Sequence, residues 1–132
     1  MTVLLKGAVL AVFVLLNTGT YRQKVEAAEK LLSKTWQIKS VDINGKRQPK
    51  GNEWEGGKLI FNKNYVFEED MDGERMVVGT WSYNALKKEI TIIDNGEEET
   101  ATMRVIMLEE NNLVLDVDEY EEVMRFYLQP SK

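Results

Sequence analysis

The chain has 132 residues and a formal net charge of −5, and it contains neither histidine nor cysteine. A chain of this length supports one domain, and an acidic surface repels phosphate backbones and anionic lipid headgroups, so we expect no nucleic-acid partner. The missing residue types exclude Ser–His and Cys–His nucleophilic sites, His or Cys zinc sites and His-ligated haem. We therefore expect a protein without enzymatic activity, bound metal or cofactor.

The N-terminal segment has the pattern of a secretory signal peptide. Lys6 precedes an unbroken apolar run over residues 7–16, and a positive start followed by such a run is typical of export signals. The run is shorter than the roughly 20 apolar residues of a membrane-spanning helix, and a buried apolar helix is the alternative. Val25-Glu26-Ala27 fits a small-x-small cleavage pattern, which divides the chain into a signal peptide over residues 1–27 and a domain over residues 28–132. Asn17-Thr18-Gly19 is an alternative cleavage site that lies closer to the apolar run but fits the pattern less well. Such a protein would be periplasmic or extracellular, with no membrane span after processing and, without cysteine, no disulfide.

After this segment the pattern changes from helical to strand-like. Residues 25–33 contain good helix formers with adjacent Leu31 and Leu32, which indicate a short helix or turn. From Thr35 onward, short apolar–polar alternations separated by turn residues predict about eight strands. We place them at residues 36–43, 57–61, 65–69, 75–83, 89–93, 100–108, 113–118 and 122–128. The strand over residues 100–108 needs a β-bulge to bring Val105 and Leu108 to one face.

The connections between these strands favour a closed meander. Asp72-Gly73 and Asn95-Gly96 predict two-residue hairpins, and residues 62–64 and 111–112 offer asparagines for positive φ. Only the segment 44–56 is a long connection. Short connections make consecutive strands pair antiparallel, and a meander of about eight strands tends to close and so remove its edges. The prediction is an all-β fold, an up-and-down antiparallel β-barrel with a short N-terminal helix.

The succession of strand patterns also resembles a known family. The patterns that carry this resemblance are Ser33-Lys34-Thr35-Trp36, Lys58-Leu59-Ile60-Phe61, Gly79-Thr80-Trp81-Ser82-Tyr83, Val105-Ile106-Met107-Leu108 and Asn112-Leu113-Val114-Leu115. They are similar to small bacterial secreted lipocalin-like domains of the calycin group. The resemblance implies a barrel closed at one end by the helix, with a basic residue of the last strand, here Arg125, across Trp36. Lys34 departs from the family pattern, which has glycine two residues before this tryptophan.

The resemblance further implies that a small apolar or amphipathic molecule binds in the barrel. The candidate ligand contacts are aromatic residues and one methionine of the expected interior and mouth: Trp54, Phe61, Tyr65, Phe67, Trp81, Tyr83 and Met103. Tyr65, Tyr83 or Arg104 would contact the polar end of the ligand. Trp54 lies in the long connection, where it either forms part of a mobile lid at the barrel mouth or fills the core as a plug.

A second function is compatible with the same fold. It is a β-barrel with a filled core whose loops contact another protein or a surface glycan. Interior volume separates the two functions, because small-molecule sites occupy about 300–1,000 Å³. The acidic clusters at residues 68–74, 97–99 and 119–122 are interpreted as solvated turns, because they lack the alternating ligand positions of an EF-hand calcium loop. The sequence does not define the oligomeric state.

Overall fold

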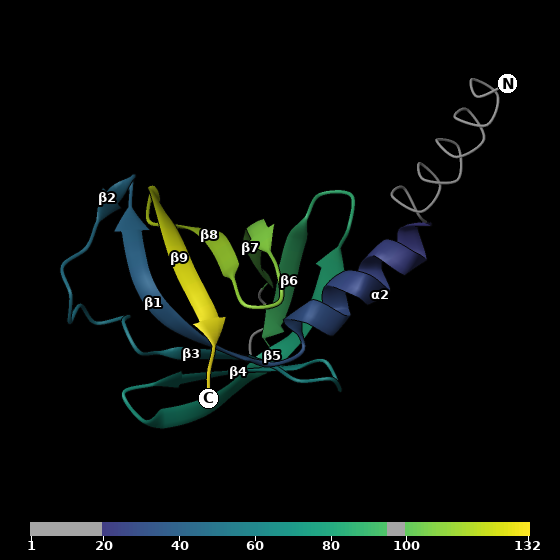
Figure 1. The fold of residues 1–132 in the computed structure, drawn as a ribbon, viewed down its shortest axis with the longest axis horizontal. Coiled ribbons are helices and arrows are strands. Elements are labelled where there is room, and N and C mark those ends of the chain that lie inside the picture. Colours follow the sequence, from purple (N-terminus) through teal and green to yellow (C-terminus); the bar gives the residue numbers. More distant parts are fainter. Residues whose placement is uncertain (1–19, 95–99) are drawn as a thin grey trace, which may run out of the picture.

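A computed structural model describes residues 20–94 and 100–132 of the chain. Within these residues the chain forms one helix and nine strands (Figure 1). The elements are α2 (Tyr21–Leu32), β1 (Thr35–Ile43), β2 (Lys46–Arg47), β3 (Lys58–Phe61), β4 (Val66–Met71), β5 (Glu74–Asn84), β6 (Glu89–Asp94), β7 (Thr100–Leu108), β8 (Leu113–Glu119) and β9 (Glu122–Pro130). Eight of the nine strands correspond to the eight predicted ones.

The strands form a closed antiparallel barrel. Each strand from β3 to β9 pairs with its neighbour along the chain, and β1 pairs with both β3 and β9. The β1–β9 pairing closes the sheet, and Figure 1 shows these two strands side by side. The predicted up-and-down barrel with a short helix is therefore confirmed.

The short strand β2 corrects the prediction of one long loop over residues 44–56. Asn44 and Gly45 have φ values of 51° and 82°, and they connect β1 to β2 in a two-residue hairpin. Asn-Gly is the strongest short hairpin signal, and the same dipeptide was the basis of the turn predicted at Asn95-Gly96. That second turn lies outside the described residues.

The other turns confirm some predictions and correct others. Asp72 and Gly73 have φ values of 55° and 78°, as the predicted two-residue hairpin requires. The residue with positive φ before β4 is Tyr65, at 68°, rather than one of the asparagines at residues 62–64. The turn between β8 and β9 consists of Tyr120 and Glu121, and both have positive φ. A tight turn can therefore impose this conformation on residues that do not prefer it.

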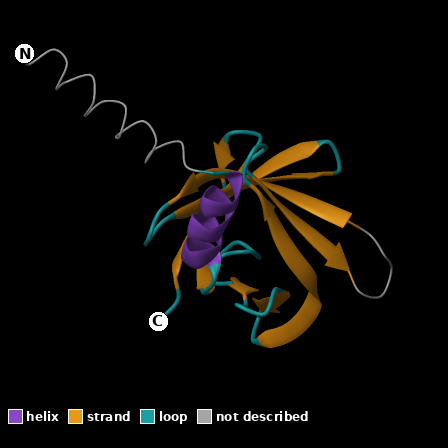
Figure 2. Ribbon diagram, turned by 90° about the vertical axis from the view of Figure 1, so that its right-hand side faces the viewer, coloured by secondary structure: helices purple, strands orange, loops and turns teal. Residues whose placement is uncertain are grey.

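Helix α2 closes one end of the barrel. It begins four residues before the predicted helix, because Thr20 and Gln23 form a reciprocal capping box at its N-terminus. Figure 2 shows the helix, in purple, lying against the strands. The helix spans the predicted boundary after residue 27, and residues 1–19 of the predicted signal peptide lie outside the described residues. Among the described residues, no helix has the length and apolar character needed to cross a membrane.

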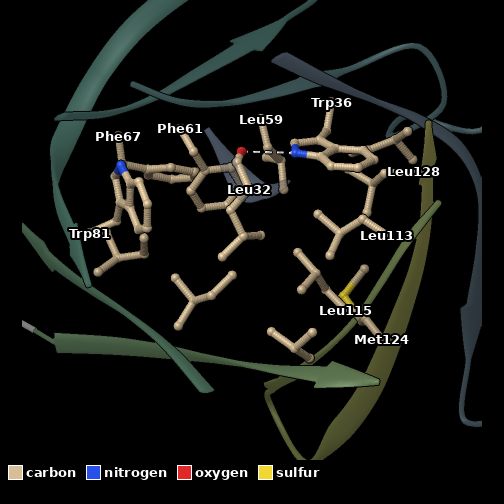
Figure 3. Packing of buried hydrophobic residues seen from close by; sticks show 14 of the residues in the cluster. Leu32, Trp36, Leu59, Phe61, Phe67, Trp81, Leu113, Leu115, Met124 and Leu128 are labelled. Carbon is tan, nitrogen blue, oxygen red and sulfur yellow. Dashed lines mark hydrogen bonds between the residues drawn. The ribbon is translucent and has the colours of Figure 1, made fainter. Parts of the chain in front are cut away.

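Trp36 anchors the helix to the barrel. Both Trp36 and Leu32 are fully buried, and the indole N–H of Trp36 donates a hydrogen bond of 3.0 Å to the Leu32 carbonyl (Figure 3). Trp36 therefore lies at the closed end of the barrel, against Leu32 of the helix. The predicted contact of Arg125 with Trp36 is wrong, because Arg125 lies on the outer face and binds Asp116. Lys34 takes that place, with its ammonium group 5.0 Å from the centre of the indole ring.

The closed half of the barrel is filled by aromatic and aliphatic side chains. The ring of Phe61 lies 5.0 Å from Phe67 and 5.5 Å from Trp81, and all three residues are buried (Figure 3). The predicted bulge in β7 is present, with a register shift between Val105 and Met107. It leaves Val105 buried and lets Leu108 pack against the core.

Candidate ligand-binding site

A cavity of about 470 Å³ lies at the end of the barrel opposite α2, which we call the open end. The hairpin turns β4–β5 and β8–β9 and the segment 48–57 lie at this end. Seven apolar side chains and four carboxylic acids line the cavity: Ile38, Trp54, Leu59, Met71, Met103, Val117, Phe126, Glu53, Glu69, Asp72 and Glu119. They come from β1, β3, β4, β7, β8, β9, the β4–β5 turn and the segment before β3.

Strand alternation brings most of the walls to the interior. Successive side chains of a strand point to opposite faces, so Met71 lies on the same inner face of β4 as the buried Phe67. Val117 on β8 is directly opposite Met124 on β9, and Met124 is part of the core. The cavity is thus the continuation of the core toward the open end, where side chains no longer fill the barrel.

Trp54 covers one side of this cavity. It is half-buried, packs against the core and lines the cavity. Its backbone is held in a tight turn, because Asn52 Oδ1 accepts hydrogen bonds from the N–H groups of Trp54 and Glu55 at 3.1 and 3.0 Å. The carbonyl of Trp54 accepts from the Gly57 N–H at 3.0 Å. These bonds place the indole against the cavity without requiring a strand.

Glu69 is the least exposed of the four acids of the site. It lies on the inner face of β4, directly opposite Leu59 of β3. Burial, and secondarily the negative charge of Glu119, raise the pKa of Glu69 above its ordinary value. An inward carboxyl group among apolar walls can donate a hydrogen bond when protonated or pair with a cation when ionised.

The other three acids lie at the rim. Glu53, Asp72 and Glu119 are exposed. In the part of the chain that the structure describes, the side chains of Glu53, Glu69, Asp72 and Glu119 form no ion pair and no hydrogen bond. Among the same residues, no group of three or more acidic side chains is placed to hold a metal ion. The mouth of the cavity therefore carries negative charge without a neutralising partner among these residues.

The sequence model of the lipocalin-like domain matches residues 32–115, which is more than half of the chain. The chain belongs to this lipocalin-like family. The resemblance in the strand patterns is thus confirmed as to family and fold. A comparison with curated proteins finds no match. The family match ends within β8, and the barrel of this lipocalin-like protein is closed by β9, beyond the matched residues.

Two of the seven predicted contacts of this lipocalin-like barrel, Trp54 and Met103, line the cavity. Phe61, Phe67 and Trp81 lie in the filled half instead. They belong to the interior as predicted, but they are not among the residues that line the cavity.

Both predicted tyrosines lie near the closed end. The Tyr65 hydroxyl donates to Glu29 Oε1 of α2 at 3.0 Å, and the Tyr65 ring lies 5.3 Å from Trp81. Tyr83 lines a separate pocket with Ala28 and Leu31 of α2. The proposed polar contact Arg104 is on the outer face, where it pairs with Asp118. None of these three residues lines the open-end cavity.

Sequence reasoning missed Glu69, although its signal was present. The alternation that places Phe67 inside continues to Glu69 two residues later. An acid in an inward position is unusual in a barrel core. That position, rather than the cluster of acids at residues 68–74, was the informative feature.

Proposed function

We propose that this lipocalin-like protein binds a small amphipathic molecule in the open-end cavity, without catalysing a reaction. The observation that supports this most is the cavity of about 470 Å³, lined mainly by apolar side chains with few polar groups. Small-molecule sites have this composition and occupy about 300–1,000 Å³. Closed barrels of about eight strands have interiors wide enough to hold one small ligand.

The distribution of filled and unfilled space favours this function over a filled-core interaction module. The closed half contains Trp36, Phe61, Phe67 and Trp81 and provides the stabilising core. The open half leaves a partly enclosed volume beside Trp54. A module that binds only through its loops would not need this volume.

We also propose that the protein functions after export, as a periplasmic or extracellular protein. The basis is the sequence pattern of Lys6 followed by the apolar run over residues 7–16. N-terminal sequencing of protein from the extracytoplasmic fraction tests it. We expect a mature N-terminus between residues 19 and 29, and recovery of intact Met1 there would contradict export by cleavage.

Binding is tested with a neutral apolar fluorescent probe, N-phenyl-1-naphthylamine. We expect saturable binding of one probe to the wild-type protein and a several-fold weaker affinity in Trp54→Ala. The melting temperature of this variant should fall only slightly, because Trp54 is half-buried. Tyr65→Ala is the matched control, since it removes an aromatic ring near the other end of the barrel, and it should leave the affinity unchanged.

Two results would contradict the proposal. One is the absence of saturable probe binding. The other is a large loss of stability in Trp54→Ala with unchanged affinity, which would identify Trp54 as a core plug and favour the filled-core interaction module.

A further inference from the structure

The acids that line the cavity differ from the acids on the outer face of the barrel. On the outer face, Glu68 binds Arg75, Asp42 binds Arg47, Asp118 binds Arg104 and Asp116 binds Arg125. Glu68 and Glu69 are adjacent on β4 and point to opposite faces. The outward one has an arginine at 2.9 Å, whereas the inward one has no ion pair among the described residues.

Among the described residues, no basic side chain lines the cavity to balance this charge. The lining residues that the structure describes include four carboxylic acids and neither lysine nor arginine. Because carboxylates in a cleft with low-dielectric walls concentrate their field in its interior, the cavity attracts cations and repels anions. The walls around them are apolar, so the remainder of a fitting ligand is apolar too.

We infer that the ligand of this cavity carries a positively charged nitrogen on an apolar body, as in an alkylammonium compound. This inference rests on the proposed binding function and specifies its ligand class. Glu69 attracts the charged nitrogen from the interior, and Glu53, Asp72 and Glu119 attract it from the rim at longer range. Trp54 also lines the cavity, and an aromatic ring adds an attraction for an ammonium group that lies over its face.

The spacing of the acids favours an organic cation over a metal ion. Among the described residues, no three acidic side chains are close enough together to hold a metal. A cavity of about 470 Å³ is also far larger than a single ion requires. A bulky ammonium group is attracted by carboxylates at several angstroms, because charge–charge attraction does not require direct coordination.

The test compares three eight-carbon probes whose headgroups are positive, neutral and negative: octylammonium, 1-octanol and octanoate. Affinities are measured by calorimetric titration at low salt and near neutral pH. We expect octylammonium to bind about ten-fold or more tightly than octanol, which corresponds to about 1.4 kcal/mol, and octanoate to bind most weakly. The advantage of octylammonium over octanol should shrink as salt is added, because salt screens charge–charge attraction at the open rim.

Variants connect this selectivity to the cavity. Glu69→Gln, and more strongly Glu69→Gln combined with Glu119→Gln, should remove most of the preference for octylammonium while octanol binding remains. Glu110→Gln is the matched control, because it removes the same charge from an exposed residue that is not part of the cavity. It should retain the wild-type preference.

The outcomes separate the two proposals. If neither octanol nor octylammonium binds, the proposed ligand-binding function fails, and the inference fails with it. If octanol binds and octylammonium binds no more tightly, or if the Glu69 variants keep the preference, the inference alone is overturned.

Discussion

Trp36 joins the helix to the barrel through both its ring and its indole N–H. It is fully buried, it donates to the Leu32 carbonyl at 3.0 Å, and Lys34 lies over the ring. We expect Trp36→Ala to lower the free energy of unfolding by about 3–5 kcal/mol, as for other large buried aromatics. Urea unfolding measures this.

A second variant separates the indole bond from ring packing. Trp36→Phe keeps an aromatic ring but loses the N–H donor, so it should cost less than Trp36→Ala. A loss below about 1 kcal/mol in Trp36→Ala would be incompatible with a buried anchor of this size.

Glu68 shows how an outward acid of β4 is neutralised. Arg75 donates two hydrogen bonds to its carboxylate, at 3.0 and 2.9 Å, and Asn62 donates a third at 2.7 Å. The hydrogen bonds from Arg75, and secondarily the bond from Asn62, lower the pKa of Glu68 to about 2. Because the unfolded chain has a glutamate pKa of about 4.3, the ionised group stabilises the fold above that pH. This contribution is lost as the pH falls from there toward 2.

A carboxyl-carbon NMR titration tests this depressed pKa. We expect a midpoint near 2 for Glu68 in the wild-type protein and a clear upward shift in Arg75→Gln. Arg104→Gln is the control, because Arg104 pairs with Asp118 on another part of the barrel, and it should not change the Glu68 titration. A wild-type midpoint near the ordinary value would show that the arginine pair does not persist in solution.

At the scale of elements, the turn between β8 and β9 holds two residues in an unfavourable conformation. Tyr120 and Glu121 have φ values of 49° and 66°, and they form a two-residue hairpin between Glu119 and Glu122. For a residue with a Cβ, this left-handed conformation costs about 1–2 kcal/mol of folding free energy. Asn-Gly is the preferred pair for such turns.

Replacement of Tyr120-Glu121 by Asn-Gly should therefore stabilise the protein by about 1–2 kcal/mol. The expected observation is a higher urea midpoint with an unchanged slope. Tyr120→Ala serves as the control, because it truncates an exposed ring but keeps a Cβ in the strained position, and it should not raise stability. An unchanged or lower midpoint for the Asn-Gly variant would argue against strain in this turn.

Most strands could be predicted because alternation and turn chemistry are local. The bulge in β7 followed from the conflict between Val105 and Leu108 within one segment. The turn at Tyr120-Glu121 carries no favourable dipeptide, so its geometry follows from the pairing of β8 with β9. The β2 hairpin was predictable from Asn44-Gly45, and it was missed because the two-residue strand after it shows no alternation.

At the scale of the whole molecule, the depth to which the barrel is filled could not be predicted. Phe67 and Met71 follow the same inward alternation on one strand, yet one belongs to the packed half and the other lines the cavity. The difference depends on distance from the closed end and on side chains from several other strands. Tyr65 was placed in the site by its aromatic character, but contacts with Glu29 and Trp81 hold it near the helix.

A row of alternating charges crosses the barrel on its outer face and includes the strand pair that closes it. Each member is paired directly with the next one on the neighbouring strand. In order, they are Arg47 on β2, Asp42 on β1, Arg125 on β9, Asp116 on β8, Arg104 on β7 and Glu89 on β6. Opposite charges directly across a sheet stabilise the pairing, whereas like charges oppose it. The row therefore favours the observed register of β9 against both β1 and β8.

Asp116 is the central and most buried member of this row. It accepts bonds of 2.7 and 2.9 Å from Arg125, and Arg104 lies 4.0 Å away on its other side. Asp116→Asn keeps the shape but leaves two arginines facing a neutral group. We expect it to lower the free energy of unfolding by about 1–3 kcal/mol, less than a fully buried pair because the arginines are partly exposed. Asp118→Asn should cost less, since that acid is exposed. Because both residues lie outside the cavity, neither variant should alter probe binding. Equal losses of unfolding free energy in the two variants would contradict a central role for Asp116 in closing the barrel.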